Sequence, residues 1–274
     1  MKKTLLFAAF VAAVCSCSHD ESENVFNSSP VENQKEVTMT FSPYEMTRSA
    51  TSISGVVNHL DVWLYESGAE FTSVHQSSSD SGFGSLSVTL DKTKTYTLYA
   101  VGHKADGASL TDGVISFTDD KVSHSMFYST TFTPANTTNL SCLMNRIVAS
   151  FRLEITDDIP ASAVKFCFTV SGVYDRWNVS TGGTHSLDRV STISYGGTSK
   201  VFSVYAIVTD AQTTHDITVT ALDENDQEVQ TRTFEDVPLR NGYKTTYRGT
   251  FFIDTTASAS FLVNDWNEYD TVDF

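Results

Sequence analysis

The chain has 274 residues, of which 40% are hydrophobic and 19% are charged, a balance that supports a buried core and excludes a wholly disordered chain. Its 18 Lys and Arg residues stand against 33 Asp and Glu residues, giving a net charge of −15. Nucleic acid and anionic membrane surfaces attract positive proteins and are therefore poor candidate partners. Four cysteines in this length exclude a disulfide scaffold.

The first residues have the pattern of a secretion signal. Lys2 and Lys3 precede an apolar run over residues 4–14. That run is shorter than the roughly 20 residues that a membrane-spanning helix needs, but it suits the hydrophobic part of a signal peptide. We therefore expect residues 1–16 to be a signal peptide.

Cys17 is the candidate lipidation site. Small Ser16 precedes it, and aliphatic Val14 lies two places before Ser16, as lipoprotein signals require. We expect a mature chain that begins at lipid-modified Cys17 and is anchored in the outer membrane. The polar stretch 17–35 would then be a tether. An ordinary secretion signal with incidental cysteines is the alternative.

Short alternating runs rich in Val, Ile, Thr, Phe and Tyr fill the rest of the chain and predict β-strands. Residues 36–41 also have strand character. The main alternating runs are 56–65, 86–90, 95–102, 114–118, 126–132, 147–155, 164–170, 201–208, 216–222, 229–234, 243–252 and 260–263. Turn segments separate them, at 66–68, 182–183, 196–197, 223–226 and 241–242.

No stretch of ten residues has a convincing helical period, so the sequence predicts an all-β protein. About a dozen short strands at this spacing indicate sandwiches rather than a parallel sheet with crossover helices. The length favours two, and the breaker cluster 134–139 lies near the middle. We predict an N-terminal sandwich over 36–142 and a C-terminal one over 143–274.

Three groups of segments together resemble the fimbrillin-like proteins of Bacteroidales, and most closely the fimbrial anchor and minor subunits. The sequences are LDVWLYESGAEF at 60–71 with TYTLYAVGHK at 95–104, NRIVASFRLEITDDIP at 145–160, and VPLRNGYKTTYRGTF at 237–251 with SFLVNDW at 260–266. The resemblance covers most of residues 36–274. The acidic stretch after Cys17 is similar to the export tether of surface lipoproteins in Bacteroidetes.

This resemblance implies a type V fimbria component with two tandem transthyretin-like β-sandwiches, exported as a surface lipoprotein. In stalk subunits of the family an Arg-specific protease cuts near the start of the first domain and removes a strand, and a neighbouring subunit donates a strand to the opened groove. The implied partners are other fimbrial subunits, and the outer membrane through the lipid on Cys17. Whether host or bacterial surface receptors are also partners stays open.

Two segments are candidates for the family's assembly sites. Arg48 follows the strand-like 36–41 and precedes small Ser49, where a maturation cut could fall; a solvated side chain and an uncut anchor subunit are the alternatives. The run Phe261, Leu262 and Val263 is the candidate donor strand. A normal closing strand of the second sandwich is its alternative.

The sequence predicts no catalytic site, no metal site and no cofactor, so we expect a protein that is not an enzyme. No two of the seven histidines are spaced two to four residues apart, which excludes a zinc-helix motif, and no nucleophile elbow is present. His103 follows a strand, where a hydrogen-bonded histidine is more common than a catalytic base. The acidic run 223–228 lacks the glycine and distant glutamate of a calcium loop and predicts a solvated turn.

Two questions stay open at this stage. An oxidising envelope would permit a disulfide between Cys142 and Cys167, whose loop of about 25 residues would add roughly 3 kcal/mol of stability, but both could be free thiols in strands. Trp177 lies in a polar stretch and could stack on a sugar ring, which would make the chain a glycan-binding surface lipoprotein. Packing of Trp177 under its own loop is the alternative.

Overall fold

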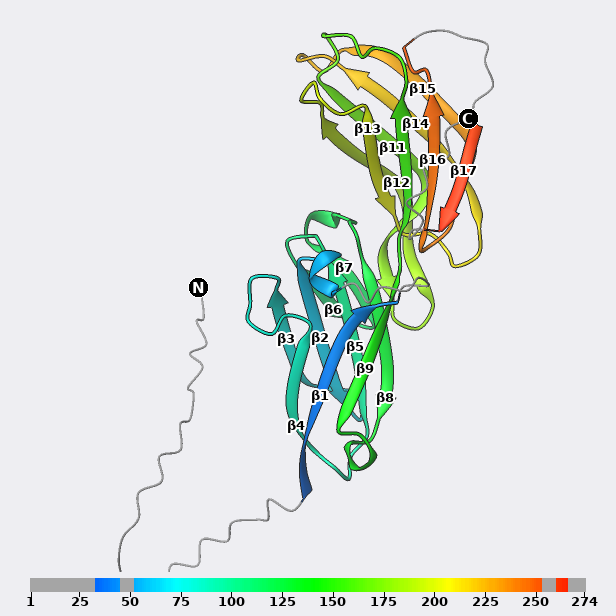
Figure 1. Cartoon of the computed structure of the whole chain (residues 1–274). Coiled ribbons are helices and arrows are strands. Elements are labelled where there is room, and N and C mark those ends of the chain that lie inside the picture. The colour runs from blue at the N-terminus through cyan, green and yellow to red at the C-terminus, as the bar shows by residue number, and fades with distance from the viewer. Residues whose placement is uncertain (1–32, 45–51, 253–259, 266–274) are drawn as a thin grey trace, which may run out of the picture. The chain divides into compact units, whose positions relative to one another are not determined.

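The computed structural model describes residues 33–44, 52–252 and 260–265, and nearly all of its regular structure is β (Figure 1). Three 3-10 helices, Ile53–Gly55, Thr118–Asp120 and Pro134–Asn136, are short turns between strands. The prediction of an all-β chain built from sandwiches is confirmed. The described residues all belong to one compact unit.

Nine strands make the first sandwich and the hairpin that follows its fifth strand. Their bounds are β1 Gln34–Pro43, β2 His59–Glu66, β3 Ala69–Ser77, β4 Ser85–Asp91, β5 Tyr96–His103, β6 Ala108–Thr111, β7 Val114–Phe117, β8 Met126–Phe132 and β9 Asn139–Arg146. The strand order is β3-β2-β5-β8-β9-β1-β4.

The order bends into two layers at β8, because β8 and β9 share only two residue pairs. The alternating apolar residues of both layers then meet in one core. It includes Val37 and Met39 from β1, Leu60 and Val62 from β2, and Leu98 from β5, all nearly or fully buried. Burial of these side chains is the main stabilising term of the sandwich.

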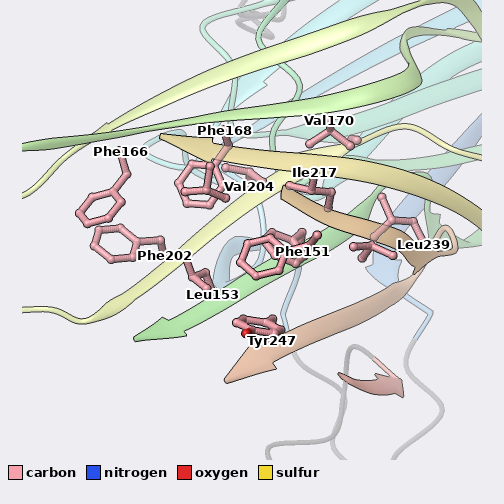
Figure 2. Close-up of a cluster of buried hydrophobic side chains, with 14 of the residues drawn as sticks. Phe151, Leu153, Phe166, Phe168, Val170, Phe202, Val204, Ile217, Leu239 and Tyr247 are labelled. Atoms are coloured by element: carbon pink, nitrogen blue, oxygen red, sulfur yellow. The ribbon is translucent and has the colours of Figure 1, made fainter. Parts of the chain in front are cut away.

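Eight strands make the second sandwich. Their bounds are β10 Ala149–Ile155, β11 Lys165–Asn178, β12 Gly182–Ser194, β13 Val201–Ala206, β14 Thr213–Leu222, β15 Glu228–Leu239, β16 Tyr243–Gly249 and β17 Ser260–Asp265. One sheet has the order β13-β10-β16-β17 and the other contains β15-β14-β11, with β12 also paired to β11. Figure 2 shows aromatic and aliphatic side chains of both sheets, among them Phe151, Phe168 and Phe202, filling the space between them.

The two sandwiches repeat one pairing pattern. In the first, β1 pairs in parallel with β9 and antiparallel with β4. In the second, β10 pairs in parallel with β16 and antiparallel with β13. The sequence has no internal repeat strong enough to reveal this, because many apolar side chains satisfy the same alternating pattern.

The hairpin β6–β7 belongs to the first half of the chain but extends a sheet of the second. Its strand β7 pairs with the end of β11, where Ile115 lies opposite Trp177. A third apolar cluster forms there from residues of both halves, including Val101, Phe127 and Ile207. The two sandwiches are therefore joined by backbone pairing and by a shared core, not by a linker alone.

Several predicted bounds are wrong. The strand predicted at 164–170 continues to Asn178, because a bulge between Val170 and Val173 interrupts the alternation without ending the strand. Gly182 and Gly183 begin β12 instead of forming a turn. Three strands rich in polar residues, β3, β6 and β12, were not predicted.

The predicted boundary between residues 142 and 143 falls inside β9. This strand runs from Asn139 to Arg146, and Met144 is buried in the core of the first sandwich. The first sandwich therefore extends beyond the breaker cluster 134–139, whose residues 134–136 form only a 3-10 turn.

Candidate functional site at the first and last strands

The first strand of the described chain is an interior strand of its layer. β1 pairs in parallel with β9, from Thr38 opposite Asn139 to Pro43 opposite Met144, and antiparallel with β4. Both of its backbone edges are thus hydrogen-bonded. The sequence MTF within its alternating pattern turns Met39 and Phe41 into the core.

β1 lies between β9 and β4, so its loss would affect mainly these two strands. Within the described residues β4 has no other strand partner, so β1 alone connects it to β9. Loss of β1 would leave two rows of backbone N–H and C=O groups unpaired above an apolar groove. A buried backbone group without a partner costs about 1–3 kcal/mol, so such a groove favours capture of another extended segment.

The predicted last strand is present as β17, Ser260–Asp265, and contains Phe261, Leu262 and Val263. It pairs antiparallel with β16, and Phe261 lies opposite Tyr247. In the described chain its second edge has no strand partner, so β17 is an edge strand of its sheet. Pairing with β16 of the same chain agrees with the alternative that this run is the closing strand of the second sandwich.

Cys17 and Arg48 lie outside the described residues. Arg48 falls in the segment 45–51, which directly follows β1 and Tyr44. Lipidation of Cys17 and cleavage after Arg48 stay predictions.

The disulfide alternative for Cys142 and Cys167 does not hold, because both thiols are free. Cys142 lies in β9 and is buried in the first core, whereas Cys167 lies in β11 of the second sandwich. Burial raises the pKa of the Cys142 thiol to about 12. Such a thiol acts as a small apolar side chain.

Trp177 is not available as a sugar platform. It is 9% exposed and packs in the cluster shared by the two halves, with its ring 5.9 Å from that of Phe127. The segment around it is part of β11 rather than a loop. The pairing of β7 with β11 buries Trp177, which makes it a structural residue.

One side-chain cluster was not predicted from the sequence. His59, His75 and His103 lie far apart in the chain, yet β2, β3 and β5 bring them together around the buried Asp61. A usable signal existed, since His59 and Asp61 share one side of an alternating strand. His103 is the hydrogen-bonded strand-end histidine that was expected, with its Nε2 2.6 Å from Asp61 Oδ2.

Among the described residues no group of three or more His, Cys, Asp or Glu side chains could hold a metal ion. The acidic run 223–228 forms the hairpin between β14 and β15, where the Asp223 carboxylate accepts hydrogen bonds from the backbone N–H groups of Asn225 and Gln227. That carboxylate therefore stabilises the turn. In the same described portion, no helix is long and apolar enough to cross a membrane.

Comparisons with known proteins show similarity in fold only. No family model matches the chain, and no curated protein matches its sequence. A crystal structure of a candidate adhesin from Bacteroides ovatus is similar with a TM-score of 0.53 and 15% identity, over 84% of this chain and 95% of the other.

Two further crystal structures are similar to the same degree. A candidate cell adhesion protein from Bacteroides uniformis has a TM-score of 0.53 and 13% identity over 85% of this chain and 99% of its own. A structure of candidate polysaccharide-binding proteins from Bacteroides thetaiotaomicron has a TM-score of 0.55 and 10% identity over 85% and 96%. The arrangement of two joined β-sandwiches is thus a known fold.

Proposed function

We propose that the protein is a cell-surface lipoprotein that serves as an anchor or accessory subunit of a fimbria and joins other subunits by β-strand addition. The position of β1 carries this proposal. A strand that is interior to its layer, apolar on one face and followed directly by the segment with Arg48 is the element whose removal would open a groove for a donated strand.

Two additional observations support a surface role. Two structures of similar fold are described as adhesion proteins, and the match to this chain covers nearly their whole length. The leader ending at Cys17 fits a lipid anchor, and the chain's excess of acidic residues suits a soluble external body better than a partner of nucleic acid.

The uncut and cut forms imply different roles. If Arg48 is left intact, the chain fills its own groove with β1 and is suited to end a fimbria at the membrane. If Arg48 is cut, β1 can leave and the groove can accept a strand from the next subunit. In either form assembly uses backbone pairing and apolar burial, and the proposed role includes no enzymatic activity.

The glycan-binding alternative has weaker support. One structure of similar fold is described as a candidate polysaccharide-binding protein. Trp177, the residue on which that alternative depended, is buried. We therefore favour assembly, and measured binding of a soluble polysaccharide would reopen the alternative.

Isolation of fimbriae tests the role. Sheared and washed fimbriae from cells that carry the gene should contain this chain or bind to cells through it, and deletion should release fimbriae into the medium or shorten them. Mass spectrometry of the N-terminal peptide should find lipid on Cys17 in an anchor, or a start at Ser49 in a cut subunit. Fimbriae that lack the chain and are unchanged by its deletion would contradict the proposal.

The variant Arg48→Lys separates the two forms. Lysine keeps the charge but is not a substrate of an Arg-specific protease. A start at Ser49 that is lost in Arg48→Lys would identify a cut subunit, whereas a mature chain that begins at Cys17 in both proteins would leave the uncut anchor.

A further inference from the structure

Three histidines and one aspartate lie together on one side of three neighbouring strands. In the strand register His59 of β2 is opposite His103 of β5, and Asp61 of β2 is opposite His75 of β3. The four side chains therefore connect the edge strand β3 to the interior strands β2 and β5. Within the described residues β2 is the only strand partner of β3.

The three imidazole rings form a stack with His59 in the middle. Its ring centroid is 5.4 Å from that of His75 and 5.4 Å from that of His103, and the ring planes differ by 26° and 22°. Phe117 of β7 contacts the His103 ring edge-on. Any positive charge on one ring therefore lies close to a second ring.

Asp61 fixes which nitrogen of each outer ring carries the hydrogen. Its Oδ1 is 2.7 Å from Nδ1 of His75, and its Oδ2 is 2.6 Å from Nε2 of His103. A carboxylate only accepts hydrogen bonds, so both ring nitrogens carry the hydrogen and donate it. In neutral His103 the other nitrogen, Nδ1, is then an acceptor.

The cluster lacks partners for more than one charged ring. Nδ1 of His103 and Nδ1 of His59 are buried and have no hydrogen-bond partner among the described atoms. A proton added to His103 would make its Nδ1 a buried donor without an acceptor. Asp61 is one carboxylate among three rings, so it can balance only one positive charge.

The surroundings of His59 also favour its neutral form. Burial lowers the pKa of His59 below its ordinary 6.5, and the positive charges that His103 and His75 can carry lower it further. The carboxylates of Asp61 and Asp106 oppose this effect without reversing it. The folded cluster therefore binds a proton at His59 less readily than the unfolded chain does.

We propose that His59, His75, His103 and Asp61 form an acid-sensitive latch that holds edge strand β3 on β2 at neutral pH and weakens when His59, in the middle of the stack, becomes charged. Because the unfolded chain protonates His59 near 6.5 and the folded chain only at lower pH, the stability that the latch supplies is present above 6.5. It is lost as the pH falls through 6.5 towards the folded pKa of His59. β3 is the element released, since it is an edge strand held by one neighbour. The latch does not depend on the proposed role in fimbriae.

Amide hydrogen exchange of the mature chain, corrected for the intrinsic pH dependence of exchange, tests the latch. We expect protection of β3 amides to fall severalfold between about pH 7.5 and 5.5, relative to amides of β14 in the second sandwich. His59→Asn, which removes the titrating ring, should abolish most of this fall. His185→Asn is the matched control, because His185 also contacts an aspartate, Asp175, but lies on β12.

The outcomes separate cleanly. Protection of β3 that does not change with pH in the native sequence, or a fall in His59→Asn equal to that of His185→Asn, would overturn the latch. If His59→Asn does not fold, NMR titration of the histidine ring protons in the native sequence decides. A midpoint for His59 below 6.5 is expected, and a midpoint at or above that value would reject the latch.

Discussion

Arg189 of β12 donates a hydrogen bond from its Nη1 to the backbone oxygen of Asp120, 2.7 Å away and 69 residues earlier in the chain. Its Nη2 donates to the backbone oxygen of Val122 at 3.4 Å. The guanidinium is buried, and the carboxylates of Asp175 and Asp120 favour its charged form against the burial that lowers its pKa. One side chain of the second sandwich thus holds the segment that follows β7.

Replacement of Arg189 should therefore weaken the whole fold. In Arg189→Met two backbone oxygens lose their donor and the buried Asp175 loses one of its positive neighbours, so we expect the free energy of unfolding to fall by about 2–4 kcal/mol. Urea unfolding followed by tryptophan fluorescence measures it, since Trp177 lies in the adjacent cluster. Lys200→Met, at an exposed ion pair, is the control and should change it by about 0.5 kcal/mol or less. Equal losses in both variants would mean that Arg189 does not join the two halves.

The two faces of β1 should respond differently to truncation. Met39 is fully buried in the first core, so Met39→Ala should lower the free energy of unfolding by about 2–4 kcal/mol through lost burial and a cavity. Thr40, the next residue, is exposed, and Thr40→Ala should cost about 0.5 kcal/mol or less. Denaturant titration of both proteins gives the comparison. Similar costs for the two changes would show that β1 is not packed as described.

Cys142 and Cys167 should differ in reactivity. Burial raises the pKa of Cys142 to about 12, so almost no thiolate forms at neutral pH and alkylating reagents should not modify it in the folded protein. Cys167 is only partly buried and should react faster. Peptide mass spectrometry after timed alkylation measures each rate separately. Preferential labelling of Cys142, or a peptide pair linked through both cysteines, would contradict the structure.

His124 should make the joined halves sensitive to acid. Nη1 of Arg146 lies 3.3 Å from its Nδ1, and its Nε2 lies 2.7 Å from the hydroxyl of Tyr205 on β13. An arginine only donates, so Nδ1 accepts and the neutral ring donates from Nε2 to Tyr205. Burial first, and then the charges of Arg146 and Lys104, lower the pKa of His124 to about 4.

The resulting stability should be complete above about 6.5 and fall as the pH drops towards about 4, because the unfolded chain binds the proton first. We expect His124 to account for a loss of up to about 3 kcal/mol over that range. His124→Gln keeps an acceptor and a donor but does not titrate, so it should lose less stability on acidification and resemble the native sequence at about pH 8. Parallel pH profiles for the two proteins would show that His124 is not the group responsible.

Alternation along the chain was enough to predict most core strands. β8 has the bounds that the sequence predicts, and buried Met126 and Phe132 mark its two ends. β5 differs by one residue at each end, and one of its faces is buried along its whole length. β3 and β12 were missed because most of their side chains are polar and few are buried, so the partner strand and not the sequence decides their structure. Edge strands have little apolar periodicity to detect.

The site residues were harder to predict because they depend on contacts between distant strands. Nothing in the stretch around Trp177 reveals that Ile115 lies opposite it, and that pairing converts a loop-like tryptophan into a buried one. The histidine stack has the same origin. Its members are separated along the chain, and only the register of β3, β2 and β5 brings them within one stack.

Electrophoresis of outer-membrane extracts without boiling tests assembly by strand addition most directly. Strand-exchanged polymers resist detergent because their contacts are backbone hydrogen bonds over a buried apolar strip. We expect a ladder of high-mass bands that contain this chain and collapse to a single monomer band after boiling. A monomer band alone in unboiled extracts of cells that display fimbriae would contradict subunit joining by β-strands.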